Sequence, residues 1–293
     1  TGPHLWNPLL LESLRSAGVP TVHTLHDLHP HAGAAYGRLL YLWNGWVRRR
    51  ADHLLVHGQC FQQELEEDGI EPSRLTCTPL THLFVDHAQA QALEETPPDV
   101  VYEPWALFLG RLEAYKGLDV LIEAARQLEQ GRIRIVIAGP GDINSLVPGE
   151  IPACVEIRDR LVGDQEAIDL FRRCGLLVLP YVEASQSALV AAAYSFSKPV
   201  VVTDAGALPE YVIADNDNAQ TGWIVPANDA SALAEILGSS LRDPERLSQM
   251  GCAGRKWYER QRRSEASTIQ QMVEKLAARR VRSSPASAAA SAI

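Results

Sequence analysis

Arg111 and Lys116 lie in a short loop whose position suits the binding of an anion. Residues 106–109 form an apolar run typical of a buried strand that ends at Gly110, and apolar residues recur at helical spacing after the loop. Open α/β sheets bind ligands at the carboxyl ends of their strands. Arg can hold a phosphate with its planar fork and Lys as a point charge, while Gly110 and Gly117 let the backbone approach. Solvated surface cations are the alternative, and this stretch alone leaves the choice open.

A Gly-Pro-Gly turn follows the next apolar run of the chain. Its glycines, Gly139 and Gly141, leave room for a sugar or a phosphate to approach the backbone. Such turns are also common in loops without any ligand. The turn therefore contributes to a predicted site only together with its neighbours.

A third loop joins a predicted strand to a predicted helix. Ser185, Gln186 and Ser187 lie at the expected helix start, where free N–H groups and the positive end of the helix dipole attract phosphate. Glu183 precedes them and can hold a sugar hydroxyl. The alternative is an ordinary helix cap beside a solvated carboxylate.

The histidines near the start of the chain are a further candidate site. His23, His26, His29 and His31 follow one another at the spacing of a strand and its exit loop, and no Cys or Glu completes a set of metal ligands. We therefore favour a neutral, hydrogen-bonding His26 that faces a cleft at the end of a strand, with Asp27 beside it.

A predicted helix over residues 36–50 ends in Arg48, Arg49 and Arg50. Cations in the last turn interact favourably with the helix dipole, which explains the run structurally. Because aromatic and apolar residues precede the arginines, contact with an anionic membrane surface is the alternative.

Composition excludes several classes of protein. The chain has 293 residues, 46% of them hydrophobic, and a net charge of −9, which argues against a basic nucleic-acid-binding face. No apolar run has the length of a membrane span, and no signal peptide is visible. Five scattered cysteines without a CxxC pair favour a reducing, cytoplasmic compartment over disulfides or a zinc site.

Strand and helix patterns alternate along the chain, which predicts an α/β fold with parallel sheets. Residues 88–104 lack a packing pattern and are the predicted linker between a first α/β domain, residues 1–87, and a second, residues 105–276, closed by a polar helix. Residues 277–293 are rich in Ala and Ser and are predicted to be disordered. The strands expected in the second domain cover residues 106–109, 134–138, 155–158, 176–179, 199–203 and 223–225. The helices expected between them cover residues 118–129, 165–173, 188–196, 208–213 and 231–239.

Taken together, these loops resemble glycosyltransferase family 4 and its relatives, the retaining GT-B enzymes. The resemblance covers residues 104–255 and rests on the order of its motifs: Gly110-Arg111 with Lys116-Gly117, Ala138 to Asp142, Leu179 to Ser187, Lys198-Pro199, Gly206 with Pro209-Glu210, and Thr221-Gly222-Trp223. It implies a GT-B-like fold of two Rossmann-like, doubly wound parallel-sheet domains that face a cleft, the first of them incomplete.

The same resemblance implies roles for the candidate residues. Arg111 and Lys116 would bind the diphosphate of a nucleotide sugar and stabilise the departing charge, and residues 185–187 would offer it their N–H groups. His26 and Asp27 look like the histidine turn of the acceptor domain, with His26 near the transferred sugar. No metal is expected, since the cations and the helix dipole supply positive charge.

The sequence departs from the family pattern at two points. Family members carry a pair of glutamates, the first near the sugar and the second on the ribose; here the second aligns with Ala192, and Glu183 lies one place from the first. The ribose contact is therefore absent or replaced. The first domain is also roughly half as long as the resemblance implies.

The predicted function is that of a retaining, hexosyltransferase-like enzyme of polysaccharide biosynthesis. The donor would be a nucleotide-diphosphate sugar, most simply UDP- or GDP-linked, and the acceptor a glycan or a lipid-linked molecule. No other cofactor and no nucleic acid is expected. A cytoplasmic location is predicted, with peripheral contact to the inner face of the membrane left open. The alternatives are a truncated or degenerate, non-catalytic nucleotide-sugar-binding module and a sugar-nucleotide epimerase, whose acid and base groups we cannot assemble.

Overall fold

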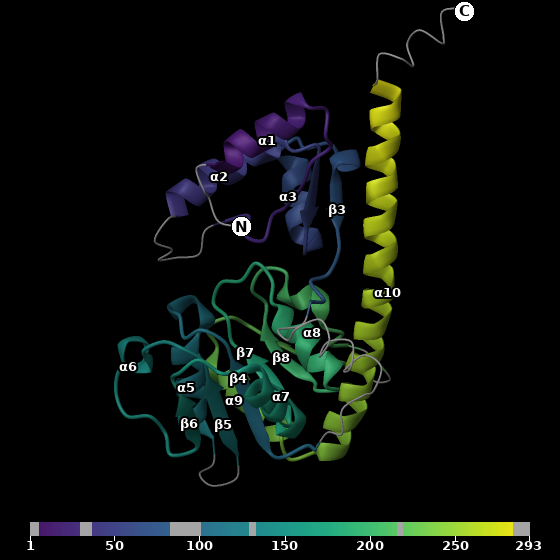
Figure 1. The fold of residues 1–293 in the computed structure, drawn as a ribbon. Coiled ribbons are helices and arrows are strands. Elements are labelled where there is room, and N and C mark those ends of the chain that lie inside the picture. Colours follow the sequence, from purple (N-terminus) through teal and green to yellow (C-terminus); the bar gives the residue numbers. More distant parts are fainter. Residues whose placement is uncertain (1–5, 30–36, 83–100, 129–132, 216–218, 284–293) are drawn as a thin grey trace, which may run out of the picture. The chain divides into compact units, whose positions relative to one another are not determined.

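The chain forms two compact units in a computed structural model (Figure 1). The first unit takes residues 1–79 together with residues 262–293, and the second takes residues 80–261. Most of the linker predicted at residues 88–104 lies outside the described residues, so the predicted domain bounds stay predictions, and each unit is described by itself. The described residues are 6–29, 37–82, 101–128, 133–215 and 219–283.

The first unit is built on a parallel sheet with the strand order β1-β2-β3. Because the strands run in one direction, the residues that follow them lie at one edge of the sheet and the residues that precede them lie at the opposite edge. The strands are β1 (Val22–Thr24), β2 (His53–Val56) and β3 (Leu75–Cys77). The helices are α1 (Trp6–Ser16), α2 (Gly37–Arg50), α3 (Gln59–Glu67) and the short 3-10 helix η1 (Pro72–Arg74).

The central strand β2 organises the core of the first unit, since all its residues are buried. Leu54 and Val56 pack in one cluster with buried residues of α2 and α3. Leu55 points to the other face and packs with Met272 and Leu276, near the end of the chain. Burial on both faces is typical of a parallel strand and explains why β2 is a continuous apolar run after its first residue.

The second unit is a parallel six-stranded sheet with the order β6-β5-β4-β7-β8-β9. The β4 strand pairs with β5 on one side and with β7 on the other, so the direction of winding reverses between β4 and β7. The predicted doubly wound α/β fold and its six strands are confirmed. The strands are β4 (Trp105–Leu109), β5 (Arg134–Ala138), β6 (Val155–Arg158), β7 (Leu176–Leu179), β8 (Val200–Thr203) and β9 (Gly222–Val225).

Helices follow the strands of the second unit in alternation. One predicted helix, at residues 208–213, is instead the 3-10 helix η3 (Leu208–Tyr211), in which backbone N–H groups bond to the carbonyl three residues earlier. The backbone becomes extended at Val212 after only four helical residues, and helical pieces this short are commonly of the 3-10 type. The other helices are α5 (Leu118–Gln127), α6 (Ile143–Leu146), α7 (Asp164–Arg173), α8 (Ala188–Ser195) and α9 (Ala230–Ser240), with the 3-10 helix η2 (Ala114–Lys116) before α5.

The last helix, α10 (Pro244–Ser283), contributes to both units. In the second unit, Arg255 donates a hydrogen bond of 2.6 Å to the carbonyl of Ser195, and the Trp257 ring contacts Tyr194. The disordered tail was predicted from residue 277, but the helix continues to Ser283, and residues 284–293 lie outside the described part. Among the described residues, no helix combines the length and the apolar character that crossing a membrane requires.

A lysine is buried in the second unit. Lys198 is fully buried, donates a 2.7 Å hydrogen bond from Nζ to the carbonyl of Val101, and lies 4.0 Å from the ring centroid of Tyr102. Burial lowers the pKa of Lys198 to about 8, because the charged ammonium loses its hydration. The folded state therefore holds this proton less tightly than the unfolded state does.

Replacing Lys198 should change how stability depends on pH. Between about pH 8 and pH 10, Lys198 binds a proton more fully in the unfolded chain than in the folded one. The free energy of unfolding should therefore rise by about 2 kcal/mol as the pH is raised through this range. In Lys198→Met this rise should be absent. Denaturant unfolding of both proteins across this pH range measures the difference, and parallel curves would contradict the assignment.

Candidate functional site

The loops after β4 and β7 flank the point where the sheet of the second unit reverses its winding. The first loop carries Arg111 and Lys116, and the second leads through Tyr181 into α8. In open α/β sheets, ligands bind at this point, beyond the carboxyl ends of the strands. The two loops that the sequence singled out are therefore neighbours in the fold.

The ammonium group of Lys116 is held over aromatic rings. Its Nζ lies 5.1 Å from the ring centroid of Tyr181 and 3.4 Å from the Tyr181 hydroxyl, and 5.8 Å from the ring centroid of Tyr115. A cation over a ring face is attracted by the negative charge of the π system. At Gly110, a Cβ atom would lie 3.0 Å from Nζ and 3.8 Å from a methyl group of Leu189, so Lys116 and the first turn of α8 flank the same glycine.

Close backbone packing sets the position of this lysine. Gly117 has a left-handed φ of 65°, and a Cβ atom there would lie 1.9 Å from the carbonyl oxygen of Pro180, so only glycine fits between the two loops. The amide of Val182 also donates a 2.8 Å hydrogen bond to the carbonyl of Tyr115. The β4 loop and the β7 loop therefore form one rigid support for Lys116.

The Gly-Pro-Gly turn lies against the β4 loop. A Cβ atom at Gly139 would lie 2.0 Å from the carbonyl oxygen of Gly110, and one at Gly141 would lie 2.6 Å from the Cβ of Leu112. The amide of Leu112 donates a 2.8 Å hydrogen bond to the carbonyl of Pro140. Both glycines thus have a packing role that the sequence did not indicate, and ligand contact by Gly139 and Gly141 stays a prediction.

The start of α8 presents unpaired N–H groups. The Ser187 hydroxyl caps the helix by accepting a 3.3 Å hydrogen bond from the amide of Leu189. Within the described residues, the backbone amides of Gln186, Ser187 and Ala188 have no hydrogen-bond acceptor. Together with the helix dipole, these donors suit an anion.

Other residues of the β7 loop differ in exposure. Ser185 is buried, and its carbonyl accepts a hydrogen bond from Ala207, whereas Glu183 is exposed beside it. Ala192 lies on α8 and is fully buried. Because the residue is an alanine, this position of the helix carries no carboxylate. Ser185 and Ser187 are buried, so Glu183 and Gln186 are the polar side chains of this loop that remain accessible.

Arg111 extends into solvent from the same loop. Its side chain is 70% exposed and lies 3.2 Å from a carboxylate oxygen of Glu113. Burial raises the pKa of Tyr115 well above its ordinary value, and its hydrogen bond to Glu113 raises it further. The exposed guanidinium can move toward a bound anion because its ion pair with Glu113 lies in high dielectric and is weak.

In the first unit, His26 lies at the edge where the strands end. Its ring is exposed and its centroid lies 5.3 Å from that of the buried His57, whose Nδ1 is 2.9 Å from the carbonyl oxygen of Thr78. The carbonyl of Asp27 accepts a 2.7 Å hydrogen bond from Asn44 of α2, which fixes the loop. His26 and Asp27 are therefore held on an ordered turn.

The other histidines of the first unit show no metal arrangement in the described part of the chain. Burial lowers the pKa of His23, and the nearby His26 lowers it further, so His23 is neutral at pH 7. His29 pairs with Glu64 at 2.7 Å, and His31 lies outside the described residues. Among the described residues, no three His, Cys, Asp or Glu side chains are placed to share a metal ion.

Two residues of the site were missed in the sequence. Tyr181 supports Lys116, and His57 lies beside His26. His57 is the last residue of a strand predicted at residues 53–57, and Tyr181 lies two residues beyond the strand predicted at residues 176–179, so strand ends alone were the available signal. Neither the lysine–aromatic contact nor the histidine pair has a spacing that a sequence pattern reveals.

A doubly wound parallel sheet with a cation and a helix start at its reversal point defines the Rossmann-like class of α/β proteins. Two family models match the chain: "Glycosyl transferase 4-like domain" over residues 2–81 and "Glycosyl transferases group 1" over residues 103–243. The chain belongs to the GT-B glycosyltransferases, as its motifs predicted.

Individual relatives agree with this family. A D-inositol 3-phosphate glycosyltransferase of Streptomyces scabiei is 29% identical over 268 residues, which cover 80% of this chain and 58% of the relative. An O-antigen chain mannosyltransferase C of Escherichia coli is 26% identical, covering 55% of this chain and 43% of that protein. The chain thus spans only about half the length of these relatives.

Solved structures show the same fold. Sucrose-phosphate synthase from Thermosynechococcus elongatus superposes with a TM-score of 0.71 at 22% identity, over 91% of this chain and 70% of that one. Anabaena Alr3699/HepE in complex with UDP-glucose superposes with a TM-score of 0.68 at 17% identity, over 92% of this chain and 76% of that one. These likenesses confirm the GT-B fold.

Substituting Gly117 should disrupt the support of Lys116. In Gly117→Ala the new methyl group would collide with Pro180, so the free energy of unfolding should fall by more than about 2 kcal/mol. Gly149→Ala is the matched control, since its φ of 95° is also positive but its nearest neighbour is a flexible side chain 3.7 Å away. Denaturant unfolding compares the two variants. If both lost the same free energy of unfolding, the loops after β4 and β7 would not be packed as tightly as described.

Proposed function

We propose that the second unit binds the diphosphate of a nucleotide sugar and that the chain supports transfer of that sugar with retention of its anomeric configuration. One observation carries the proposal: the ammonium of Lys116 and the start of α8 flank Gly110 at the reversal point of the sheet. A diphosphate there would receive an ion pair and the amides of residues 186–188.

The chemistry we propose is electrostatic. As the bond between the sugar and the diphosphate breaks, negative charge grows on the leaving phosphate, and Lys116, Arg111 and the α8 amides would stabilise it. A nucleophilic side chain is not assigned. Since these groups supply the positive charge, binding is expected without Mg²⁺.

The sugar and the ribose would be held differently from each other. Glu183 is exposed in the β7 loop and is proposed to accept a hydrogen bond from a sugar hydroxyl. The buried Ala192 offers nothing to the ribose, which favours a second candidate, a nucleotide-sugar-binding module without turnover. Formation of a glycosylated product from a nucleotide sugar would distinguish the two.

For the acceptor side we propose His26 and Asp27. His26 is exposed on a turn fixed by Asn44 and supported by His57, which suits a side chain that meets a sugar. The relatives named for inositol phosphate and O-antigen chains support a glycan or a lipid-linked acceptor, and the HepE complex supports a UDP-linked donor. If His26→Ala left sugar transfer unchanged, this role would be wrong.

We also propose peripheral contact with an anionic membrane through α2. Leu39, Tyr41 and Leu42 are each about half exposed or more on this helix, and Arg49 and Arg50 follow in its last turn. Apolar side chains that enter the headgroup region and cations that meet anionic lipids are the two components of interfacial binding.

Removing the two cations of the β4 loop should weaken nucleotide binding. Titration of the chain with UDP, GDP and ADP by calorimetry, first without metal and then with magnesium, should show binding of one nucleotide without metal. Arg111→Ala and Lys116→Ala should each weaken it by about tenfold or more, since a charge-assisted contact contributes roughly 1.5–3 kcal/mol.

The matched control for this titration is Arg126→Ala. Arg126 is an exposed cation on α5 of the same unit that pairs with Glu123, so the affinity should stay unchanged. Affinities that respond equally to all three substitutions, or not at all, would show that the diphosphate does not bind in the β4 loop.

Membrane contact is tested with vesicles that contain phosphatidylglycerol. Leu39→Ser together with Leu42→Ser should lower the bound fraction of protein in a sedimentation assay, because two exposed apolar side chains are removed. Leu161→Ser is the control, as Leu161 is 79% exposed in the second unit. Unchanged sedimentation of the α2 variant would exclude this contact.

A further inference from the structure

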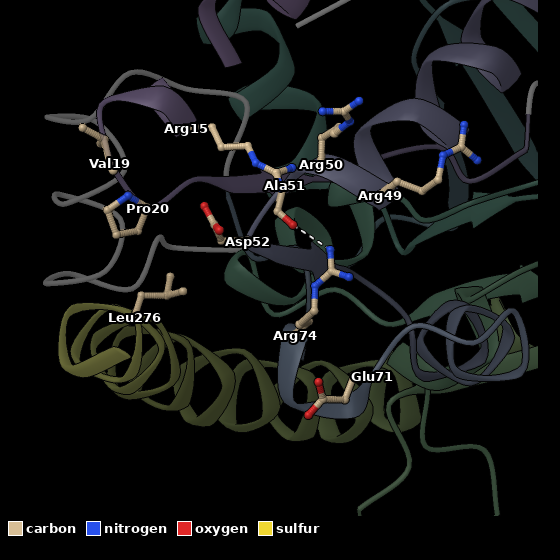
Figure 2. A pocket seen from close by; sticks show the side chains of 11 residues that line it. Arg15, Val19, Pro20, Arg49, Arg50, Ala51, Asp52, Glu71, Arg74 and Leu276 are labelled. Atoms are coloured by element: carbon tan, nitrogen blue, oxygen red, sulfur yellow. Dashed lines mark hydrogen bonds between the residues drawn. The ribbon is translucent and has the colours of Figure 1, made fainter. Parts of the chain in front are cut away.

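A cavity of about 520 Å³ lies in the first unit, at the edge where its strands begin (Figure 2). Its walls include Gly18 to Pro20 just before β1, Ala51 and Asp52 just before β2, and Arg74 just before β3. His26 and His57 follow β1 and β2, so they lie at the opposite edge. This cavity is therefore separate from the candidate acceptor residues.

Four arginines from three elements line the cavity. Figure 2 shows the side chains of Arg15, Arg50 and Arg74 gathered around Ala51, with Arg49 further along α2. They come from the last turn of α1, the last turn of α2 and from η1. We name this cavity the arginine pocket. The arginine pocket is therefore a local concentration of positive charge in a chain whose net charge is −9.

Two of the arginines have structural partners. Arg74 donates two hydrogen bonds from Nη2, of 3.0 Å and 2.6 Å, to the carbonyls of Arg48 and Ala51 at the end of α2 (Figure 2). Arg50 pairs with Glu12 of α1 at 2.7 Å. These contacts cap α2 and join it to α1, so they hold the walls of the pocket in place.

The other two arginines have none. Within the described residues, Arg15 and Arg49 form no ion pair and no hydrogen bond through their side chains, and both are exposed. The carboxylates of the pocket are engaged elsewhere: Asp52 accepts hydrogen bonds from the amide and the hydroxyl of Thr21, and Glu71 accepts one from Ser73. Asp52 and Glu71 each keep a negative charge, but four arginines and only these two carboxylates line the pocket, so its net charge stays positive.

We propose that the arginine pocket binds a phosphate group, independently of the donor site. Guanidinium groups bind phosphate oxygens through paired N–H donors, and several of them around one cavity favour a dianion over a single carboxylate. A helix dipole explains a cation at the end of one helix, but it does not explain why cations of two helices and of η1 meet at one cavity. A soluble phosphate ester and a phospholipid headgroup offer the same chemistry.

The test uses the whole chain with Arg111→Ala and Lys116→Ala, so that the β4 loop does not compete for phosphate. Pyrophosphate is titrated by calorimetry, and binding to vesicles of phosphatidylglycerol is compared with binding to vesicles of phosphatidylcholine. The variant is Arg15→Gln with Arg49→Gln, which should fold normally because neither side chain has a partner in the described chain.

The matched control is Arg48→Gln with Arg126→Gln. It removes the same charge, but Arg48 pairs with Asp68 and Arg126 with Glu123, and neither lines the pocket. We expect the Arg15/Arg49 variant to bind pyrophosphate about tenfold or more weakly than the control. Loss of phosphatidylglycerol binding alone, in the Arg15/Arg49 variant but neither in the control nor in Leu39→Ser with Leu42→Ser, would support the pocket and identify a lipid headgroup as its ligand.

Two results would overturn the proposal: equal binding by the variant and the control, or no binding of either probe before Arg15 and Arg49 are replaced. Neither result bears on the donor site, because the cations of the β4 loop are already absent from every protein in this experiment. Nucleotide binding by the unmodified β4 loop is measured separately, so the two proposals succeed or fail independently.

Discussion

The contact of Gly117 with the Pro180 carbonyl is the constraint on which the candidate donor site depends. It brings the backbone after β4 against the backbone after β7, next to Lys116, whose ammonium lies over the ring of Tyr181. The β5 turn adds a second wall through Gly139, which lies against Gly110. Three loops thus pack on one another before any ligand is present, which is the preorganisation that electrostatic stabilisation requires.

The same logic gives the two edges of the first sheet different chemistry. At the carboxyl edge, the imidazole rings of His26 and His57 lie side by side. At the amino edge, arginines from two helix ends and from η1 line one cavity. A parallel sheet places all strand ends of one kind together, so residues far apart in the sequence share a site without any pattern that links them.

The sequence predicted the fold well because its strands are short and mostly apolar, and several of them end at a glycine or a proline. Residues 134–138, 155–158 and 176–179 were placed correctly to the residue. The errors are local: the helix expected at 208–213 is a short 3-10 segment that ends where Val212 is extended, and α10 continues past residue 276. Local patterns predict such elements, whereas the order of the strands came from the structure.

The site was predicted less completely, because side-chain partners come from tertiary packing. The motifs located Arg111, Lys116 and residues 185–187, but the packing role of Gly139, the aromatic support of Lys116 and the pairing of His57 with His26 needed the structure. The arginine pocket is the clearest case, since Arg15, Arg49 and Arg74 are unrelated in sequence and each one alone is an ordinary surface residue.

The most direct test of the donor site is a crystal structure of the chain with the nucleoside diphosphate that binds it most tightly. The account predicts phosphate oxygens within hydrogen-bond distance of Lys116 Nζ and of the amides of residues 186–188. A diphosphate bound away from the β4 and β7 loops, with Lys116 still over Tyr181 and the α8 amides still unpaired, would contradict it.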